Sequence, residues 1–507
     1  MKKILAIITA LTMAFVMTSC GKTETEKAET DEDQAASQAE TQTTADESED
    51  ATAAPVGTET AESSQGGSDS GRPEAPPDGG EGPGGEGGAP GGNGAPGGGS
   101  SSADISYSGA IEITSADERS GETYVSTESD QSALLISTSD DVTITDPNVT
   151  KSGDSDGGDN CNFYGLNAAV LVKDGSSTTI SGGTVTSDAD GANGVFCYGG
   201  NGGQNGASGD GTTVVISNTV ITTNGNGSGG IMTTGGGITK AYDLTVTTNG
   251  QSSAPIRTDR GGGTVYVDGG TYTSNGLGSP AIYSTADITV ENASLISNLS
   301  EGVCIEGLNS IKLINCNLTA NNTKCNGNAT FLDSVMIYQS MSGDADSGTS
   351  TFSMTGGALT SKNGHVFHVT NTTANIILSG VSIVNEDGDN VLLSVCDDGW
   401  SGGTNSAVLT ASAQVLEGAI LVGDNSALDM TLTTGSSFTG RIDGNITNAS
   451  GTTVSTEVGT VSITLDSDST WTLTGDSYIT EFDGDPANVI SNGYTLYVNG
   501  SALTGTN

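Results

Sequence analysis

Positive charge is scarce in this chain. Its 507 residues include 15 Lys plus Arg and 2 His against 61 Asp plus Glu, for a formal net charge of -46. Proteins that bind nucleic acid or anionic lipid headgroups need clustered basic residues. The composition therefore argues against a nucleic-acid partner and against attachment to lipid headgroups by charge. It suits solubility outside the cell and the binding of cations.

Histidine is nearly absent as well. The two His residues, His365 and His368, lie three apart in an apolar run, and residues three apart on a strand point to opposite faces. We expect them to share neither a metal nor a proton. Since a Ser-His-Asp triad has no other candidate for its base, this chemistry is not expected.

Helical periodicity is missing after the first 20 residues, and aromatic residues make up only 4% of the chain. Runs such as 264–267 and 375–378 instead alternate with a period of two and are rich in Val, Ile and Thr. Gly, Asn, Asp and Ser interrupt these runs every few residues. The pattern is typical of short β-strands, and the low aromatic content suits a narrow core of small aliphatic side chains.

A repeat organises these strands. The segment 281–321 contains two copies of a unit of about 21 residues that cannot bury its apolar face alone. We predict that three strand positions, mostly apolar, recur from copy to copy and form three aligned rows along the chain. The first row is Val170, Val195, Ile231, Ile256, Ile282, Val303, Val335, Val366 and Val391. The second is Ile180, Ile216, Ala241, Val267, Val290, Leu313, Met354, Leu378 and Leu409. The third, five residues after the first eight members of the second, is Val185, Ile221, Val246, Tyr272, Leu295, Leu318, Leu359 and Ile383.

Three short strands per turn, stacked in parallel, make an all-β fold, the right-handed parallel β-helix. The spacing between the second and third rows is constant whereas the spacing between copies varies, so insertions leave the stack through turns. We expect the β-helix to span 105–507 as one domain, with capping rungs at both ends.

The N-terminus carries a secretion signal. Lys2 and Lys3 precede an apolar run from Ile4 to Met17 that is too short for a confident membrane span. Residues 17–21, MTSCG, resemble the bacterial lipobox, which implies that residues 1–20 are a lipoprotein signal peptide and that Cys20 is lipidated. The alternative is cleavage nearby, with Cys20 incidental. A lipid would anchor the chain to the outer face of the membrane without spanning it.

Residues 21–104 contain no aromatic residue, Ile or Leu, and are acidic, with a Gly/Pro-rich second half. Such a segment cannot bury enough apolar surface to offset its ordering entropy. It is predicted to be a disordered tether that holds the folded domain off the membrane.

The acidic turn at 152–160 is a candidate calcium site. Asp154, Asp156 and Asp159 lie within six residues, and Ca²⁺ prefers oxygen ligands from carboxylate-rich loops. The run lacks the terminal Glu of a full twelve-residue calcium loop. A solvated turn without metal is the alternative.

The turn that begins at Arg257 is the candidate ligand site. Arg257 and Arg260 flank Asp259, and a guanidinium can fork onto the carboxylate of an acidic sugar or of a neighbouring rung. A structural ion pair with Asp259 is the competing interpretation. Tyr283 could add an aromatic platform for sugar rings, together with Tyr242, Tyr266 and Tyr272, unless some of these fill the core.

Six cysteines follow Cys20, at 161, 197, 304, 316, 325 and 396. Their spacing matches no zinc pattern. An even number in an exported protein permits disulfides, but isolated Cys also behaves as a small apolar residue in a core. Both possibilities stay open.

The lipobox, the acidic tether and the run from Ser252 to Ile288, SSAPIRTDRGGGTVYVDGGTYTSNGLGSPAIYSTADI, together resemble a family. It is the adhesin-like, right-handed β-helix surface lipoproteins of Gram-positive anaerobes, within the broader pectate-lyase-like superfamily. The resemblance implies a lipid-anchored, surface-exposed adhesin or carbohydrate-binding scaffold that is non-catalytic. Its partner would be a polysaccharide or a host or bacterial surface ligand, with calcium a possible cofactor.

The alternative function is a polysaccharide lyase or glycoside hydrolase, as found among pectate-lyase-like proteins. Such an enzyme needs several carboxylates and Arg257 or Arg260 converging in one groove. A binding protein needs a groove of aromatic and polar side chains on one β face. The sequence favours a protein that is not an enzyme, since fold alone does not license activity.

Overall fold

The computed structural model describes residues 105–202, 208–400 and 403–507, and the regular secondary structure of these residues is nearly all β-strand. Within them there is one α-helix, α1 (Asp159–Tyr164), and one 3-10 helix, η2 (Pro486–Asn488). No helix in these ranges has the length and apolar character needed to cross a membrane. The predicted signal peptide, Cys20 and the tether lie outside the described residues.

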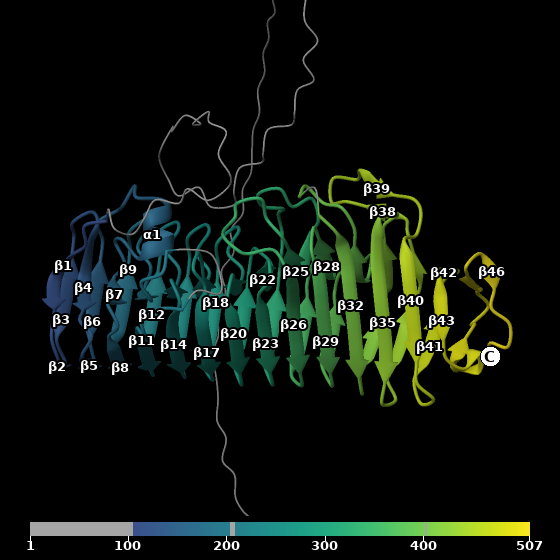
Figure 1. Cartoon of the computed structure of the whole chain (residues 1–507), viewed down its shortest axis with the longest axis horizontal. Helices are drawn as coiled ribbons and strands as arrows, with labels where there is room; N and C mark the ends of the chain where they lie inside the picture. The colour runs from purple at the N-terminus through teal and green to yellow at the C-terminus, as the bar shows by residue number, and fades with distance from the viewer. Residues whose placement is uncertain (1–104, 203–207, 401–402) are drawn as a thin grey trace, which may run out of the picture. The chain divides into compact units, whose positions relative to one another are not determined.

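Three long sheets of parallel strands run side by side along the stack (Figure 1). Sheet A consists of β1 (Ser108–Ile113), β4 (Gln131–Ser137), β7 (Val170–Lys173), β10 (Val195–Tyr198), β13 (Ile231–Thr234), β16 (Ile256–Thr258), β19 (Ile282–Ser284), β22 (Val303–Glu306), β25 (Asp333–Tyr338), β28 (His365–Thr370), β31 (Val391–Val395), β34 (Ala419–Val422) and β37 (Ile442–Asp443).

Sheet B consists of β2 (Asp117–Ser120), β5 (Asp141–Thr145), β8 (Ser177–Ser181), β11 (Thr213–Ser217), β14 (Gly237–Tyr242), β17 (Gly263–Asp268), β20 (Asp287–Glu291), β23 (Ser310–Ile314), β26 (Thr349–Thr355), β29 (Thr373–Ser379), β32 (Asn405–Ser412), β35 (Ser426–Thr433), β40 (Thr460–Leu465) and β43 (Glu481–Asp483). Sheet C consists of β3 (Thr123–Ser126), β6 (Asn148–Lys151), β9 (Thr184–Ser187), β12 (Val220–Thr223), β15 (Thr245–Thr248), β18 (Thr271–Ser274), β21 (Ser294–Ser297), β24 (Asn317–Ala320), β27 (Ala358–Ser361) and β30 (Ser382–Asn385).

Shorter sheets complete the C-terminal part. A four-stranded parallel sheet contains β33 (Val415–Glu417), β36 (Ser437–Gly440), β41 (Thr470–Leu473) and β44 (Val489–Ile490). The remaining strands are the antiparallel pair β38 (Ile446–Thr447) and β39 (Thr453–Ser455), and the sheet of β42 (Ser477–Ile479), β45 (Leu496–Val498) and β46 (Ser501–Ala502).

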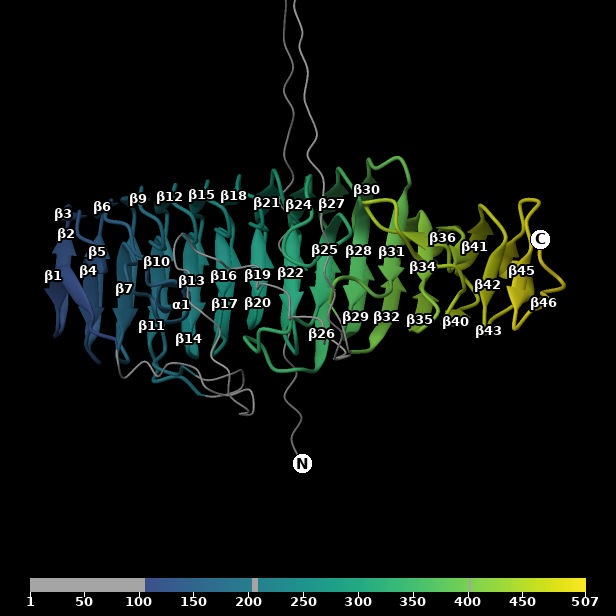
Figure 2. The same ribbon diagram turned by 90° about the horizontal axis from the view of Figure 1, so that it is seen from above.

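Up to β30, each rung contributes one strand to sheet A, one to sheet B and one to sheet C, and then the chain starts the next rung; later rungs place the third strand in the four-stranded sheet. The result is a right-handed parallel β-helix, which confirms the predicted fold class (Figure 2). The inward side chains of the three sheets form one continuous apolar core, in which Ile256, Val267 and Tyr272 of a single rung are all fully buried.

A two-residue turn between sheets B and C keeps the rungs in register. Its first residue has a positive φ in ten successive rungs, which only Gly, Asn and Asp adopt at little cost. These ten residues are Gly121, Asp146, Gly182, Asn218, Asp243, Gly269, Asn292, Asn315, Gly356 and Gly380. Because the turn never changes length, the five-residue spacing between the second and third rows is constant.

The predicted rows are mostly confirmed by the strand pairing. All eight members of the third row are aligned, as are the first seven members of the first row and the first eight of the second. The predictions for the last positions of the first and second rows are wrong. Phe367, Leu393 and Ala411 stand where Val366, Val391 and Leu409 were expected. The pairing of β31 shifts between Val391 and Leu393, and apolar side chains adjacent in sequence hid this shift.

Sheet A differs from the other sheets because both of its faces are buried. Every residue of β10 and of β22 is buried, for example, whereas buried and more exposed residues alternate along the strands of sheets B and C. The outward face of sheet A is covered by α1 and by long loops. Thr234 Oγ1 donates a hydrogen bond of 2.7 Å to the carbonyl oxygen of Phe163, which fastens α1 to the sheet.

Substitutions in the turn between sheets B and C test whether its positive φ keeps the rungs in register. Asn292, with φ 55°, tolerates Gly, so Asn292→Gly should change the free energy of unfolding by less than about 0.5 kcal/mol. Asn292→Val places a β-branched side chain in the left-handed region and should lower it by about 1–2 kcal/mol. Chemical denaturation of both variants measures the difference. Equal stabilities would contradict the proposed role of the turn.

Candidate functional site

A cavity of about 130 Å³ lies on the outward face of sheet A, which is room for roughly ten water molecules. The rungs from β13 to β22 have short loops, while those of β7 and β10 before them and of β25 after them have long ones. Helix α1 lines one side, and the segments around Asn326, Asp344 and Trp400 line the others. Variation in loop length therefore leaves a hollow over three adjacent strands.

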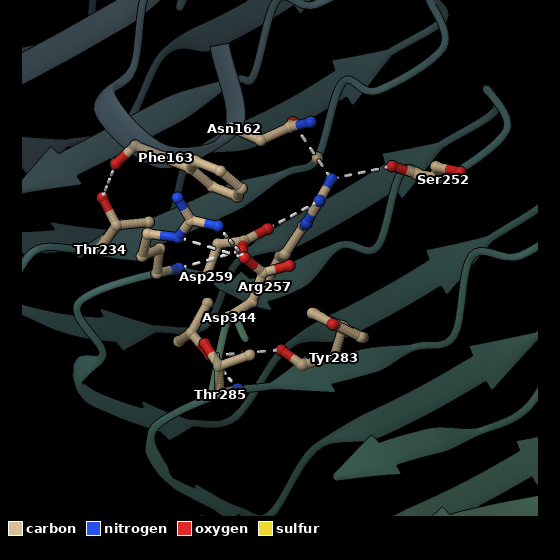
Figure 3. A network of polar contacts seen from close by, with 12 residues as sticks. Asn162, Phe163, Thr234, Ser252, Arg257, Asp259, Tyr283, Thr285 and Asp344 are labelled. Carbon is tan, nitrogen blue, oxygen red and sulfur yellow. Dashed lines mark hydrogen bonds and ion pairs between the residues drawn. The ribbon is translucent and has the colours of Figure 1, made fainter. Parts of the chain in front are cut away.

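Arg257 forms the floor of the cavity (Figure 3). Its Nη2 donates to Asp259 Oδ2 at 2.9 Å, and its Nη1 donates to Asn162 Oδ1 at 3.3 Å and to the carbonyl oxygen of Ser252 at 3.0 Å. The side chains of Arg257 and Asp259 are 9% and 4% exposed. Since one guanidinium joins α1, β16 and the preceding loop, this ion pair is part of the cavity's framework.

Arg260 joins a second, distant segment to the site. Its Nη2 and Nε donate to Asp344 Oδ1 at 2.5 and 3.2 Å, and its guanidinium lies 4.2 Å from the centre of the Phe163 ring. Asp344 is 84 residues further along the chain. The contact holds the 339–348 loop against α1 and closes one side of the cavity.

Aromatic side chains line much of the remainder. Phe163 and Tyr283 lie near the two guanidinium groups, and Tyr338 and Trp400 pack together with ring centres 5.0 Å apart. Tyr283 and Tyr338 both donate to Glu306 Oε2, at 2.6 and 3.2 Å. These bonds fix the orientation of both phenol rings. The indole Nε1 of Trp400 is buried and has no hydrogen-bond partner among the described residues.

Burial dominates the electrostatics of the acidic groups. It raises the pKa of Asp259 to about 7, although Arg257 opposes the shift. Burial also raises the pKa of Asp159, with a smaller contribution from the Asp344 carboxylate, and the pKa of Glu301 and Glu306. The cavity thus presents carboxyl groups that are poorly compensated by positive charge.

All four residues of the predicted ligand site meet in this cavity. Arg257, Asp259, Arg260 and Tyr283 line it, and the predicted structural ion pair between Arg257 and Asp259 is present. Both guanidinium groups are engaged by carboxylates of the chain itself. Whether these residues contact a ligand stays a prediction.

The three predicted calcium ligands are not brought together. Asp154 Oδ1 accepts a hydrogen bond of 2.9 Å from the backbone N–H of Asp190, whereas Asp159 is at the rim of the cavity. Across 105–202, 208–400 and 403–507, no group of three or more His, Cys, Asp or Glu side chains is placed to hold a metal ion. Of the three carboxylates, that of Asp154 is bonded to a neighbouring rung.

The expectation that His365 and His368 point apart is wrong. Nδ1 of each ring lies 2.7 Å from Ser394 Oγ, and Nε2 of His368 lies 3.4 Å from Asp398 Oδ2. Strict alternation fails at the start of β28, where Phe331 packs against both rings. His368 and Ser394 are fully buried, His365 is half-buried, and the cluster lies outside the cavity lining.

The predicted tyrosine platform is divided between two sheets and the core. Tyr272 is fully buried, while Tyr242 and Tyr266 pack edge to face on sheet B, with ring centres 6.1 Å apart. Only Tyr283 belongs to the cavity. The six cysteines of the described residues are free thiols, and Cys304 lines the cavity floor.

Sequence reasoning missed several residues of the site. Phe163, Tyr338, Trp400, Glu301 and Asp344 were not among the predicted site residues. One signal was available: unbroken apolar runs such as 195–197 and 335–337 indicate strands buried on both faces. That pattern predicts that loops cover sheet A, but not which loops.

Comparison with family models, curated proteins and solved structures found no match to this chain. The function therefore has to be argued from the residues of the cavity.

Asp259 should leave a signature in the pH dependence of stability. Because its pKa is raised to about 7 in the folded state from about 3.9 in the unfolded state, the folded state binds the extra proton between these values. Its contribution to stability is therefore full below about pH 4 and lost as the pH rises toward 7. Asp259→Asn removes this loss, so the variant should gain stability relative to the unmodified protein by up to about 1.4 kcal/mol per pH unit in that window.

Urea denaturation at pH 4.5, 5.5, 6.5 and 7.5 measures this difference. Asp429→Asn, on the exposed face of β35, is the matched control. If the difference in the free energy of unfolding between Asp259→Asn and the unmodified protein is the same at all four pH values, Asp259 is ionised throughout. That result would contradict the raised pKa of Asp259.

Proposed function

We propose that this protein is a lipid-anchored surface protein of the adhesin type that binds carbohydrate in the cavity over sheet A without catalysing a reaction on it. The predicted signal peptide and Cys20 support export and anchoring, and the predicted tether would hold the β-helix away from the membrane. The cavity is the observation that carries the binding function. Its aromatic rings and polar groups on one β face are the combination expected for sugar recognition.

Sugar rings present apolar C–H faces and hydroxyl groups. In the cavity, Tyr283, Tyr338 and Trp400 offer flat apolar surfaces, and the unpaired Trp400 N–H offers a donor to a hydroxyl oxygen. Glu306 holds both tyrosines in place, so little side-chain entropy would be lost on binding. A preorganised site of this size suits one sugar unit of a longer polysaccharide.

A glycoside hydrolase or lyase is the second candidate, and one observation favours it. Several carboxyl groups converge with both Arg residues, and the pKa of Asp259, raised by burial to about 7, is near that of an effective general acid or base. The hydrogen bonds of Asp259 argue against an enzyme. Asp259 Oδ2 accepts from Arg257 and Oδ1 accepts from the backbone N–H of Arg260, so neither oxygen is free to exchange a proton with a substrate. Binding is therefore the better supported function.

A glycan array probed with the full chain tests the proposal. We expect saturable binding to at least one class of polysaccharide, weakened about ten-fold or more in Trp400→Ala because a stacking surface and a hydrogen-bond donor are both lost. Tyr266→Ala, on the outer face of sheet B, removes an aromatic side chain away from the cavity and should bind like the unmodified protein.

Failure to bind any glycan, or an equal loss of glycan affinity in Trp400→Ala and Tyr266→Ala, would contradict this function. Release of new reducing or unsaturated chain ends from the bound polysaccharide, abolished in Asp259→Asn, would replace it with the enzyme.

A further inference from the structure

The two ends of the cavity differ in charge. Arg257 and Arg260 are at the end formed by α1, each paired with a carboxylate of the chain. Glu301 is among the lining residues together with Tyr338, Trp400 and Cys304, and it forms no ion pair with a basic side chain anywhere in the described part of the chain. Four acidic side chains line the cavity against two basic ones.

The surroundings of Glu301 contain more hydrogen-bond acceptors than donors. Glu301 accepts from Ser300 Oγ and from Asn322 Nδ2, the latter at 3.2 Å. Beside it, Asp333 Oδ1 and Asn322 Oδ1 are buried without any partner among the described residues, and both residues are 1% exposed. Neither Asp333 nor Asn322 is among the lining residues, so a ligand in the cavity would meet Glu301, whose surroundings are rich in acceptors and therefore favour positive charge.

The charges around Glu301 also favour a positively charged group in the cavity. Asp333 interacts electrostatically with Glu301 and with Asp398, and Glu306 lies behind the hydroxyl groups of Tyr283 and Tyr338. The pKa of Asp333 and that of Glu301 are raised, by burial first of all, so their charged forms lack compensation. Aromatic faces next to such carboxylates, as presented by Tyr338 and Trp400, attract a cation more than a neutral group or an anion.

From these contacts we infer that the sugar taken up by the cavity carries a free ammonium group, which binds at the Glu301 end between the carboxylate and the Tyr338–Trp400 pair. This inference rests on the proposed carbohydrate-binding function and names its ligand class, an amino sugar that is not N-acetylated. An ammonium group supplies the positive charge that Glu301 lacks, and its N–H groups are donors for the Glu301 carboxylate in the cavity lining. The indole N–H of Trp400 is then left for an oxygen of the same sugar.

The test is isothermal titration of the full chain with four tetrasaccharides. Tetramers of β-1,4-linked glucosamine, N-acetylglucosamine and glucose differ only at C2 of each ring, and a tetramer of galacturonate supplies the acidic sugar. We expect the glucosamine tetramer to bind about ten-fold or more tightly than the glucose tetramer, because a hydrogen bond to a charged group is replaced by one to a hydroxyl.

Glu301→Gln should remove this preference for the glucosamine tetramer over the glucose tetramer, because the charge that holds the ammonium group is lost. Glu417→Gln, on an exposed position of β33, is the matched control and should keep the preference. The comparison among ligands uses the unmodified protein, so it remains decisive even if Glu301→Gln fails to fold.

Equal affinity for the glucosamine, N-acetylglucosamine and glucose tetramers would overturn the inference but leave carbohydrate binding standing. Tighter binding of the galacturonate tetramer would overturn it in favour of ligand contacts by Arg257 and Arg260. Binding of none of the four, together with an empty glycan array, would remove the proposed function as well.

Discussion

The rung-to-rung register of the backbone is the constraint on which everything else depends. Every strand of the three long sheets pairs in parallel with the corresponding strand of the next rung, and the turn between sheets B and C always has two residues. With one corner invariant, insertions are confined to the other two corners. Both of those corners border sheet A. The site lies over sheet A because only there can the chain vary without breaking the stack.

Loop length then decides where along sheet A a cavity can form. Helix α1 covers the sheet before β16, and the loops at 321–332 and 339–348 and the segment 396–400 project beyond β22. The rungs between them are short, and their outward residues Arg257, Tyr283 and Cys304 stay uncovered at the cavity floor. Two ion pairs, Arg257 with Asp259 and Arg260 with Asp344, connect this floor to its walls. Few basic residues exist in the chain, and two of them are used here.

The fold was predictable from the sequence to within two residues per strand for most rungs, since period-two alternation and a fixed turn are local signals. The failures at Val366, Val391 and Leu409 come from apolar neighbours that fit the row equally well. The candidate site was predictable only in part. Arg257, Asp259 and Arg260 stand out because they are adjacent and rare. Glu301, Tyr338, Asp344 and Trp400 come from other rungs, and only the lengths of the intervening loops bring them together. No local pattern reports such long-range contacts.

The central claim is that the cavity over sheet A holds a sugar, and Trp400 can report on it directly. The chain contains only two tryptophans, and the other, Trp471, is fully buried in the core. The decisive measurement is the tryptophan emission of the full chain during titration with its best-binding oligosaccharide. A saturable change in emission that disappears in Trp400→Phe is predicted. Calorimetric binding of the same oligosaccharide with no change in emission would place the ligand elsewhere and contradict the account.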